Sequence, residues 1–128
     1  MKIALVVITA ILLMITCIQI SADDVIIPEG CEVVRCTCYT PTGQKTATGV
    51  YPYEGICASN LEHLGQVAVV YDLDLRIVGF FEARDLGGHE DIKTGKRIDI
   101  FRNNDSGVKA WQKEVGDYVI VQWVSGKG

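Results

Sequence analysis

Hydrophobic residues are concentrated at the start of the chain and then in short runs separated by polar turns. The first run extends from Ile3 to Ile15 and contains one polar residue, Thr9. Lys2 comes before it, and Gln19, Ser21 and Ala22 lie between it and Asp23. This order of charged, apolar and small-residue regions is typical of a secretory signal peptide, which we predict at residues 1–22. A retained membrane anchor is the alternative, because the longer stretch Ile3–Ile20 approaches the length that spans a bilayer.

The later runs are rich in β-branched and aromatic residues, which predicts strands. They are Cys31–Tyr39, Gln66–Tyr71, Leu75–Ala83, Arg97–Phe101 and Asp117–Val124. A turn with two aspartates separates the second run from the third, so these two are expected to form a hairpin. Residues 40–55 are rich in glycine and proline and predict a long loop with at most one short strand.

One stretch has helical spacing. Val108, Trp111 and Val115 recur every three or four residues and predict a short helix over Gly107–Val115, with Ser106 as its cap. One helix and about six strands predict an all-β (mainly) fold. A small closed or nearly closed barrel fits best, because closure removes the exposed edges of many short strands.

Length and charge narrow the possible functions. Without residues 1–22 about 106 residues remain, which suits one compact domain. The chain has 12 Lys and Arg against 16 Asp and Glu, a net charge of -4. This balance argues against a nucleic-acid partner and against electrostatic attachment to anionic lipid. We expect a secreted monomer with no membrane contact once the signal peptide is cleaved.

Four cysteines follow the predicted signal peptide: Cys31, Cys36, Cys38 and Cys57. An even number in an exported chain predicts two disulfides. A bridge between Cys36 and Cys38 would close a strained loop, so two connectivities remain, in which each of these pairs with Cys31 or Cys57. A four-thiolate zinc site is the alternative, although its usual two-residue spacings are absent. We expect neither a metal nor a cofactor.

The segment from Asp85 to Asp99 carries the candidate chemistry. Gly87 and Gly88 place this segment in a predicted loop, where they would let the backbone approach a ligand or turn with positive φ. Asp99 lies between two isoleucines of a predicted strand, so its side chain points away from theirs, toward solvent or a cleft. From this pattern alone, a solvated carboxylate paired with a neighbouring basic residue is the alternative.

Several short motifs occur in a fixed order. They are Tyr39, Thr46-Ala47-Thr48-Gly49, Leu64-Gly65, Asp85-Leu86-Gly87-Gly88, Ile92-Lys93, Gly95 and Arg97-Ile98-Asp99-Ile100-Phe101. This order resembles the bacterial 3D domain, a family named for three aspartates. The resemblance implies a 3D-like double-psi β-barrel at residues 36–124, after a leader and first strand at 23–35. The family is related to the barrel of membrane-bound lytic transglycosylase A and to cell-wall proteins of spore-formers.

The resemblance also implies a function in the bacterial cell wall. Related enzymes cut peptidoglycan glycan strands between N-acetylmuramic acid and N-acetylglucosamine and leave a 1,6-anhydro sugar. Carried over by position, Asp99 would be the catalytic acid and base and Asp85 its supporting aspartate. Such an acid needs a raised pKa, which burial and a neighbouring carboxylate supply. The implied substrate-binding residues are Tyr39, Thr48, Gly87, Gly88 and Lys93.

The sequence departs from the family pattern in two places. Ser59 or Asn60 stands where the pattern has its first aspartate, and residues 89–91 are inserted after the glycine pair. Glu90 or Asp91 is a candidate replacement for the missing carboxylate. The missing aspartate favours a second hypothesis, a non-catalytic module that binds peptidoglycan or another polysaccharide. A third is a secreted effector or inhibitor that uses the barrel as a scaffold.

The remaining aromatic and histidine residues add few candidates. Trp111 and Trp123 are expected to fill the core, since buried tryptophans are the commoner case. His63 and His89 are too few for a three-histidine metal site and are expected on the surface. Tyrosines 51 and 53 of the long loop are candidates for a substrate wall.

Overall fold

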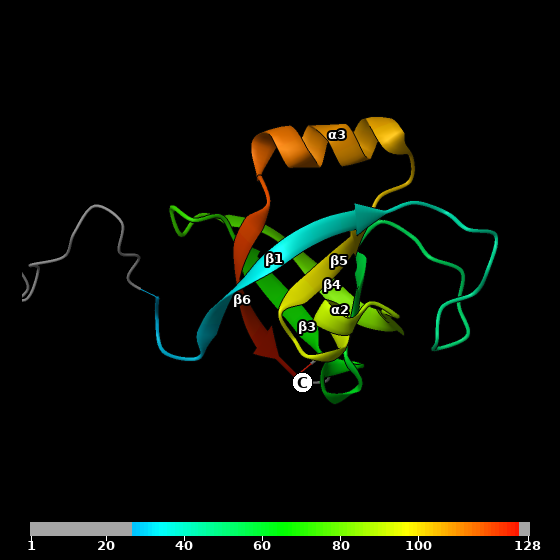
Figure 1. Ribbon diagram of the computed structural model, residues 1–128, viewed down its shortest axis with the longest axis horizontal. Helices are drawn as coiled ribbons and strands as arrows, with labels where there is room; N and C mark the ends of the chain where they lie inside the picture. The colour runs from blue at the N-terminus through cyan, green and yellow to red at the C-terminus, as the bar shows by residue number, and fades with distance from the viewer. Residues whose placement is uncertain (1–26, 126–128) are drawn as a thin grey trace, which may run out of the picture.

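Six strands form a closed barrel in the computed structural model, which describes residues 27–125. The strands are β1 (Cys31–Tyr39), β2 (Ile56–Ser59), β3 (Val67–Tyr71), β4 (Ile77–Leu86), β5 (Arg97–Phe101) and β6 (Tyr118–Val124). Their order around the barrel is β1-β5-β2-β4-β3-β6 (Figure 1). The predicted signal peptide, 1–22, lies outside the described residues. In the part of the chain that is described, no helix is long and apolar enough to cross a membrane.

The strand order brings distant parts of the chain together. β1 pairs with β5 in parallel and β2 pairs with β4 in parallel, whereas the other four pairings are antiparallel. Parallel neighbours need long crossover connections, so this barrel cannot be a simple series of hairpins. As a result β5 lies between β1 and β2, and residues from four strands share one outer face.

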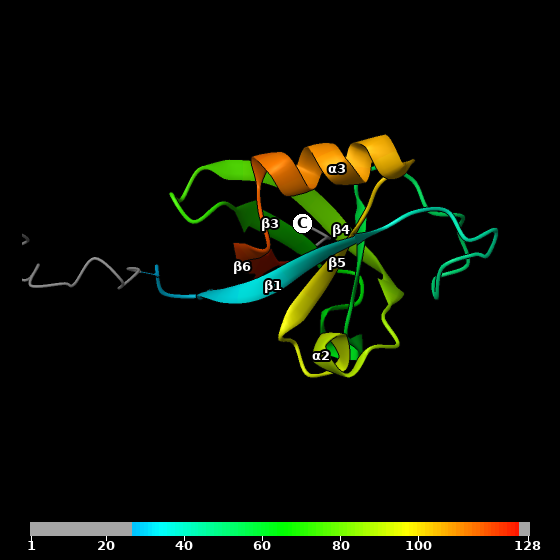
Figure 2. The same cartoon turned by 45° about the horizontal axis from the view of Figure 1, so that its top comes forward.

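The core lies inside the barrel and is closed by one helix. Alternate residues of the strands point inward, including Val34 and Cys36 of β1 and Ile98 and Ile100 of β5. The helix α3 (Asp105–Glu114) lies along the barrel, well apart from the short helix α2 (Glu90–Lys93) (Figure 2). Trp111 joins α3 to the core and is 5 % exposed, as the sequence predicts. Trp123 is only half-buried and packs against the core from β6.

Most predicted elements are confirmed, with four corrections. The helix is capped by Asn104 rather than Ser106, because the Asn104 side chain accepts from the Gly107 N–H at 2.8 Å. The sequence did not predict β2, because all four of its residues are buried and polar and apolar residues do not alternate along it. The short helix α2 lies inside the predicted loop. The fourth correction bears on the site: β4 continues to Leu86, so Asp85 lies on a strand.

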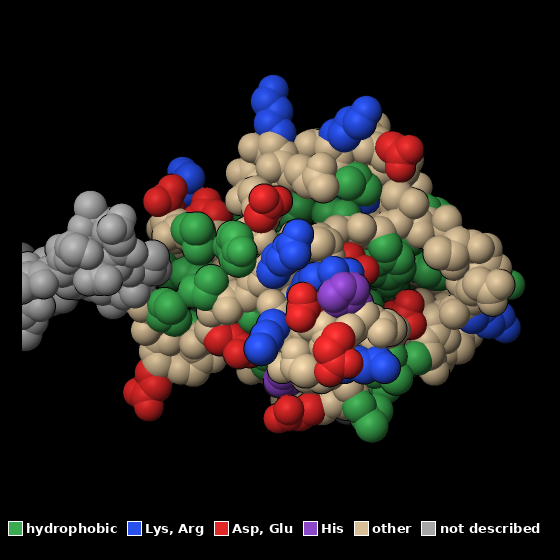
Figure 3. Space-filling view, in the orientation of Figure 1, with side chains coloured by type: hydrophobic (Ala, Val, Ile, Leu, Met, Phe, Trp, Pro, Cys, Tyr) green, Lys and Arg blue, Asp and Glu red, His purple; other side chains and the backbone are tan. Residues whose placement is uncertain are grey.

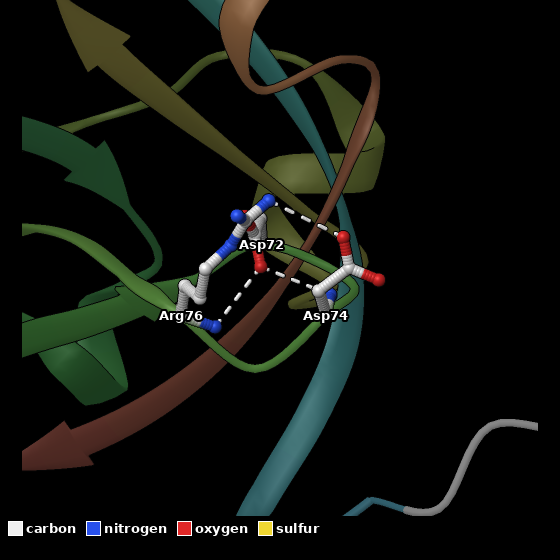
Figure 4. Close-up of polar contacts among 3 residues, drawn as sticks. All are labelled: Asp72, Asp74 and Arg76. Carbon is white, nitrogen blue, oxygen red and sulfur yellow. Dashed lines mark hydrogen bonds and ion pairs between the residues drawn. The ribbon is translucent and has the colours of Figure 1, made fainter.

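A carboxylate organises the turn of the predicted hairpin between β3 and β4. Asp72 Oδ1 accepts from the backbone N–H of Asp74 at 2.9 Å and of Arg76 at 3.0 Å (Figure 4). Asp72 Oδ2 accepts from Arg76 Nε at 3.1 Å. These hydrogen bonds lower the pKa of Asp72, and the one from the backbone N–H of Arg76 has the largest effect. The turn also holds Leu75 at a φ of 66°, which is unusual for a residue other than glycine.

The structure contains none of the predicted disulfides, and all four cysteines are free thiols. Cys38 and Cys57 face Ile100 of β5 from opposite sides, so two strand spacings, about 9–10 Å, separate their backbones. A disulfide needs Cα atoms within about 7 Å. Cys36 lies two residues before Cys38 on β1 and is therefore not in register with Cys57. Cys31 is on the same extended strand as Cys36 and Cys38. Neither predicted connectivity fits this register. Within the described residues, no metal-binding cluster of these cysteines occurs either.

We expect the thiols to react in an order set by burial. Burial raises the pKa of Cys36 to about 12 and that of Cys38 to about 11, and it also raises the pKa of Cys57. At pH 8 a disulfide reagent should therefore modify Cys31 first and leave Cys36 and Cys57 unmodified until the barrel unfolds. Mass spectrometry of peptides after timed labelling measures this order, and modification of Cys57 in the folded protein would contradict it.

Candidate functional site

Two carboxylates meet on the outer face of the barrel, in one row that crosses four strands. Thr37 of β1 is in register with Asp99 of β5, Asp99 with Ala58 of β2, and Ala58 with Asp85 of β4. The side chains of this row turn away from the core, as the hydrogen bond from Thr37 to Asp99 requires. One strand, β2, thus separates the two aspartates, and its small residue Ala58 lies between them.

A β-bulge places Asp85 in this row. Along β4, Phe81 and Ala83 point into the core, so strict alternation would send Asp85 inward as well. The register between β2 and β4 shifts at this point: Cys57 faces Ala83, and Ala58 already faces Asp85. One extra residue on β4 reverses which face the next side chain takes. The bulge therefore directs Asp85 outward, toward Asp99.

Thr48 holds this bulge and does not line the hollow between the aspartates. The Thr48 N–H and hydroxyl both donate to the carbonyl of Arg84, the extra residue, at 3.3 and 3.0 Å. The preceding N–H, of Ala47, donates to Asp85 Oδ1 at 3.0 Å. Gly49 closes the turn with a φ of 88°, which favours glycine. The bonds of Thr48 thus help to fix the position of Asp85, and a contact of Thr48 with substrate stays a prediction.

Asp85 is held as an acceptor of three hydrogen bonds. Its Oδ1 accepts from Ala47 and from the N–H of Leu86 at 2.9 Å, and its Oδ2 accepts from the Tyr39 hydroxyl at 3.4 Å. Burial and the nearby carboxylates raise the pKa of Tyr39, so its phenol stays a donor at neutral pH. Three donors on one group suit an ionised carboxylate, which can only accept.

Asp99 is in a different environment from Asp85. It is half-buried, and burial raises its pKa above the ordinary value. The neighbouring Asp85 raises the pKa further, while the hydrogen bond from Thr37 at 2.9 Å and the charge of Arg97 lower it. Two carboxyl groups whose surroundings differ in this way are the usual arrangement of an acid and its charged partner.

The two aspartates line a hollow of about 190 Å³ together with three predicted substrate-binding residues. Its walls are Tyr39, Ala58, Asp85, Leu86, Gly87, Gly88 and Asp99. The hollow is smaller than the roughly 300–1,000 Å³ of a pocket that encloses a whole ligand. It therefore suits one reacting group of a longer molecule that extends over the surface.

A second hollow, of about 250 Å³, adjoins the first through Leu86 and Gly87. Lys93 lines this second hollow together with Gly87, apart from Tyr39, Gly88 and the two aspartates. Ser59 and Asn60, the two residues that the resemblance matched to a first aspartate, also line the second hollow and not the first. Glu90 and Asp91 lie on α2, and among the described residues only Asp85 and Asp99 bring carboxyl groups to the first hollow.

The other candidates lie away from the hollow. Tyr51 and Tyr53 are 61 % and 45 % exposed and line neither hollow. His89 is on the surface as expected, where its Nδ1 accepts from the Asp91 N–H at 3.1 Å and caps α2. His63 is half-buried, in contrast to the prediction, because it stacks on Trp123 with ring centroids 4.2 Å apart.

The sequence analysis missed Thr37, Ala58 and Leu86. The position of Thr37 could be predicted from the sequence, because this residue lies two positions before Tyr39 on a predicted strand and must share its face. Ala58 and Leu86 became visible only when the pairing of β2 with β4 was known. A small residue between two carboxylates has no sequence pattern of its own.

We expect the substitution Asp99→Asn to raise stability at neutral pH. A carboxyl group with a raised pKa in the folded state destabilises the fold once it is ionised, so stability falls as pH rises from about 3.9, the ordinary value, through the folded pKa. The variant should therefore unfold at higher urea than wild type at pH 7, and the difference should vanish near pH 3. Asparagine keeps the oxygen that accepts from Thr37.

Asp85→Asn is the matched control. It replaces one of the two oxygens that accept hydrogen bonds and should lower the free energy of unfolding at pH 7 by about 1 kcal/mol. Urea titrations of both variants at the two pH values measure this contrast. A loss of stability in Asp99→Asn at pH 7 would contradict the burial argument.

Comparison with known proteins gives no relative from which a function could be transferred. No protein-family model matches the chain, and no curated protein matches it significantly. The proposals below therefore depend on the site itself and on the motif order.

Proposed function

We propose that this chain is a secreted cell-wall protein of the 3D family with double-psi topology. It cleaves peptidoglycan glycan strands as a lytic transglycosylase does. The observation that carries the proposal is the pair of aspartates in one open hollow, one half-buried with a raised pKa and the other held by three donors. Both are the aspartates that the motif order assigns to catalysis.

The proposed reaction needs one group that first gives and then takes a proton. The Asp99 carboxyl group donates its proton to the glycosidic oxygen as the bond from that oxygen to the anomeric carbon of N-acetylmuramic acid breaks. The Asp99 carboxylate then accepts the proton of the 6-hydroxyl group of the same sugar, whose oxygen bonds to the anomeric carbon. The product is a 1,6-anhydro sugar, and Asp99 is protonated again.

Asp85 and Tyr39 support this cycle. The anomeric carbon gains positive charge as the glycosidic bond breaks, and a fixed carboxylate nearby stabilises that charge. Asp85 is fixed by the bulge and by its hydrogen bonds to Ala47, Leu86 and Tyr39 before any substrate binds. The raised pKa of Asp99 keeps a larger fraction of it protonated at a given pH than an ordinary aspartate.

A digestion of purified sacculi tests the proposal. Residues 23–128 are incubated with sacculi, and soluble products are searched for 1,6-anhydro muropeptides by mass spectrometry. Asp99→Asn should lower the rate by about 100-fold or more, as expected for loss of a general acid. Asp74→Asn, at the exposed hairpin turn, makes the same chemical change away from the hollow and should leave the rate unchanged.

The alternative is a non-catalytic peptidoglycan-binding or polysaccharide-binding module. The observation that favours it is Ser59, which lines the second hollow and leaves only two aspartates in the first. Binding to sacculi without release of any anhydro product would support this alternative and contradict the enzymatic proposal. Cleavage by Asp99→Asn at the wild-type rate would also contradict the enzymatic proposal.

A further inference from the structure

Two arginines lie side by side on the outer face that carries Asp99. Arg35 of β1 and Arg97 of β5 are directly in register, two residues before Thr37 and Asp99 on their strands. Residues two apart on a strand share a face, so the arginines and the acid are on the same side, roughly 7 Å apart along the strands. Like charges directly opposite each other are destabilising. The repulsion between the two arginines therefore has to be offset by an opposite charge.

Asp99 is a nearby opposite charge for Arg97, but the two side chains do not form an ion pair. No ion pair of the described residues includes Arg35 or Arg97. The Nε atom of Arg97 is buried, yet it has no hydrogen-bond partner, and it is the only such buried side-chain atom among the described residues. A buried donor without a partner is costly, and such groups are rare in folded proteins. Two adjacent guanidinium groups, one with a free buried donor, are therefore suited to bind an anion.

The surroundings of the pair make a ligand accessible. Arg35 is exposed, and the exposed Tyr118 of β6 is in register with it on the other side. Lys96 comes directly before Arg97 and is exposed as well. Figure 3 shows Lys and Arg side chains, with Asp and Glu side chains between them, on the face where β1, β5 and α2 lie toward the viewer.

We propose that Arg35 and Arg97 form an anion site that binds the carboxylate of an acidic substituent on the sugar held at the hollow. The planar guanidinium group binds a carboxylate with two parallel hydrogen bonds, and Arg97 Nε supplies a donor that is already desolvated. The choice of sugar rests on the proposed function: where a glycan strand carries no stem peptide, the lactyl carboxylate of N-acetylmuramic acid is free, and N-acetylglucosamine has none. The site would thus favour N-acetylmuramic acid without a stem peptide next to Asp99.

The anion would also act on the acid. The positive charge of Arg97 lowers the pKa of Asp99 in the free protein. A carboxylate bound to Arg97 offsets that charge, so the bound substrate keeps Asp99 protonated at the moment when a proton donor is needed. A neutral sugar does not have this effect. Recognition of the substituent and activation of the acid would then be one event.

A matched pair of ligands tests the site without requiring cleavage. N-acetylmuramic acid and its methyl ester have nearly the same shape, but only the acid carries the charge. Isothermal titration should show the wild-type protein binding the acid at least about tenfold more tightly than the ester. The ¹⁵N-¹H signal of Arg97 Nε should move with the acid and stay with the ester.

Arg35→Gln and Arg97→Gln should each bring the ratio of the two affinities close to one. Lys113→Gln, which removes one positive charge from the exposed side of α3, should leave the ratio as in wild type. Because Arg35 is exposed, its variant keeps the test valid if Arg97→Gln fails to fold. Equal binding of acid and ester by wild type, no saturable binding of the acid, or an unchanged ratio in both folded variants would overturn the site. Tighter binding of N-acetylglucosamine 6-phosphate than of the acid would overturn its assignment to a carboxylate.

The outcomes separate this site from the proposed function. A protein that prefers the acid through Arg35 and Arg97 but releases no anhydro product from sacculi keeps the anion site and loses the proposed cleavage. A protein that releases the product yet binds acid and ester equally keeps the cleavage and loses the anion site.

Discussion

Replacing Trp111 by alanine is expected to lower the free energy of unfolding by about 3–5 kcal/mol, a large part of the stability of a domain of this size. Trp111 is the buried residue of α3 and contacts Phe81 edge to face, with ring centroids 5.5 Å apart. Its Nε1 donates to the buried Cys36 Sγ at 3.3 Å. The substitution would leave a cavity between helix and barrel and remove the donor to Cys36.

Two variants serve as controls for this loss. Lys109→Ala, on the exposed side of α3, should change stability by no more than about 0.5 kcal/mol. Trp123→Ala removes a tryptophan that is only half-buried and should have a smaller effect than Trp111→Ala. Urea unfolding followed by circular dichroism measures all three. Equal losses for the two tryptophans would contradict the placement of Trp111 as the residue that fixes the helix.

Gly87→Ala is expected to destabilise the protein by about 1–3 kcal/mol, because the added methyl group has no space. A Cβ atom at Gly87 would lie 2.5 Å from two side-chain atoms of Ile92, the buried residue of α2. Gly87 lines both hollows, so a shift of Ile92 would also change the wall between them. The sequence predicts that Gly87 lets the backbone approach a ligand or turn with positive φ. Its φ is not positive, and the structure shows instead that a larger side chain at this position would collide with Ile92.

Gly88→Ala is the matched control at the next position. A Cβ atom there would have nothing within 4 Å, and the φ of Gly88 is not positive. Thermal unfolding should therefore show a clear loss for Gly87→Ala and little change for Gly88→Ala. If both variants unfold like wild type, the contact between Gly87 and Ile92 does not limit stability.

The sequence by itself determined those elements that local patterns specify. The bounds of β1 and β5 agree with the predicted Cys31–Tyr39 and Arg97–Phe101, because alternating β-branched residues favour half-buried strands wherever they pair. The hairpin of β3 and β4 and the inward-facing Trp111 follow from turn residues and helical spacing in the same way. The outward direction of Asp99 needed only its two isoleucine neighbours.

Only the tertiary structure decided how these elements combine into a site. Parallel pairing joins segments far apart in the chain, and no local pattern encodes which strand lies beside which. Asp85 shows this most clearly, because alternation along β4 alone would bury it in the core. The bulge held by Thr48 directs it to the outer face, and the order β1-β5-β2-β4 then places it one strand from Asp99. The same register, set by inter-strand hydrogen bonds, separates the cysteines and brings Arg35 beside Arg97.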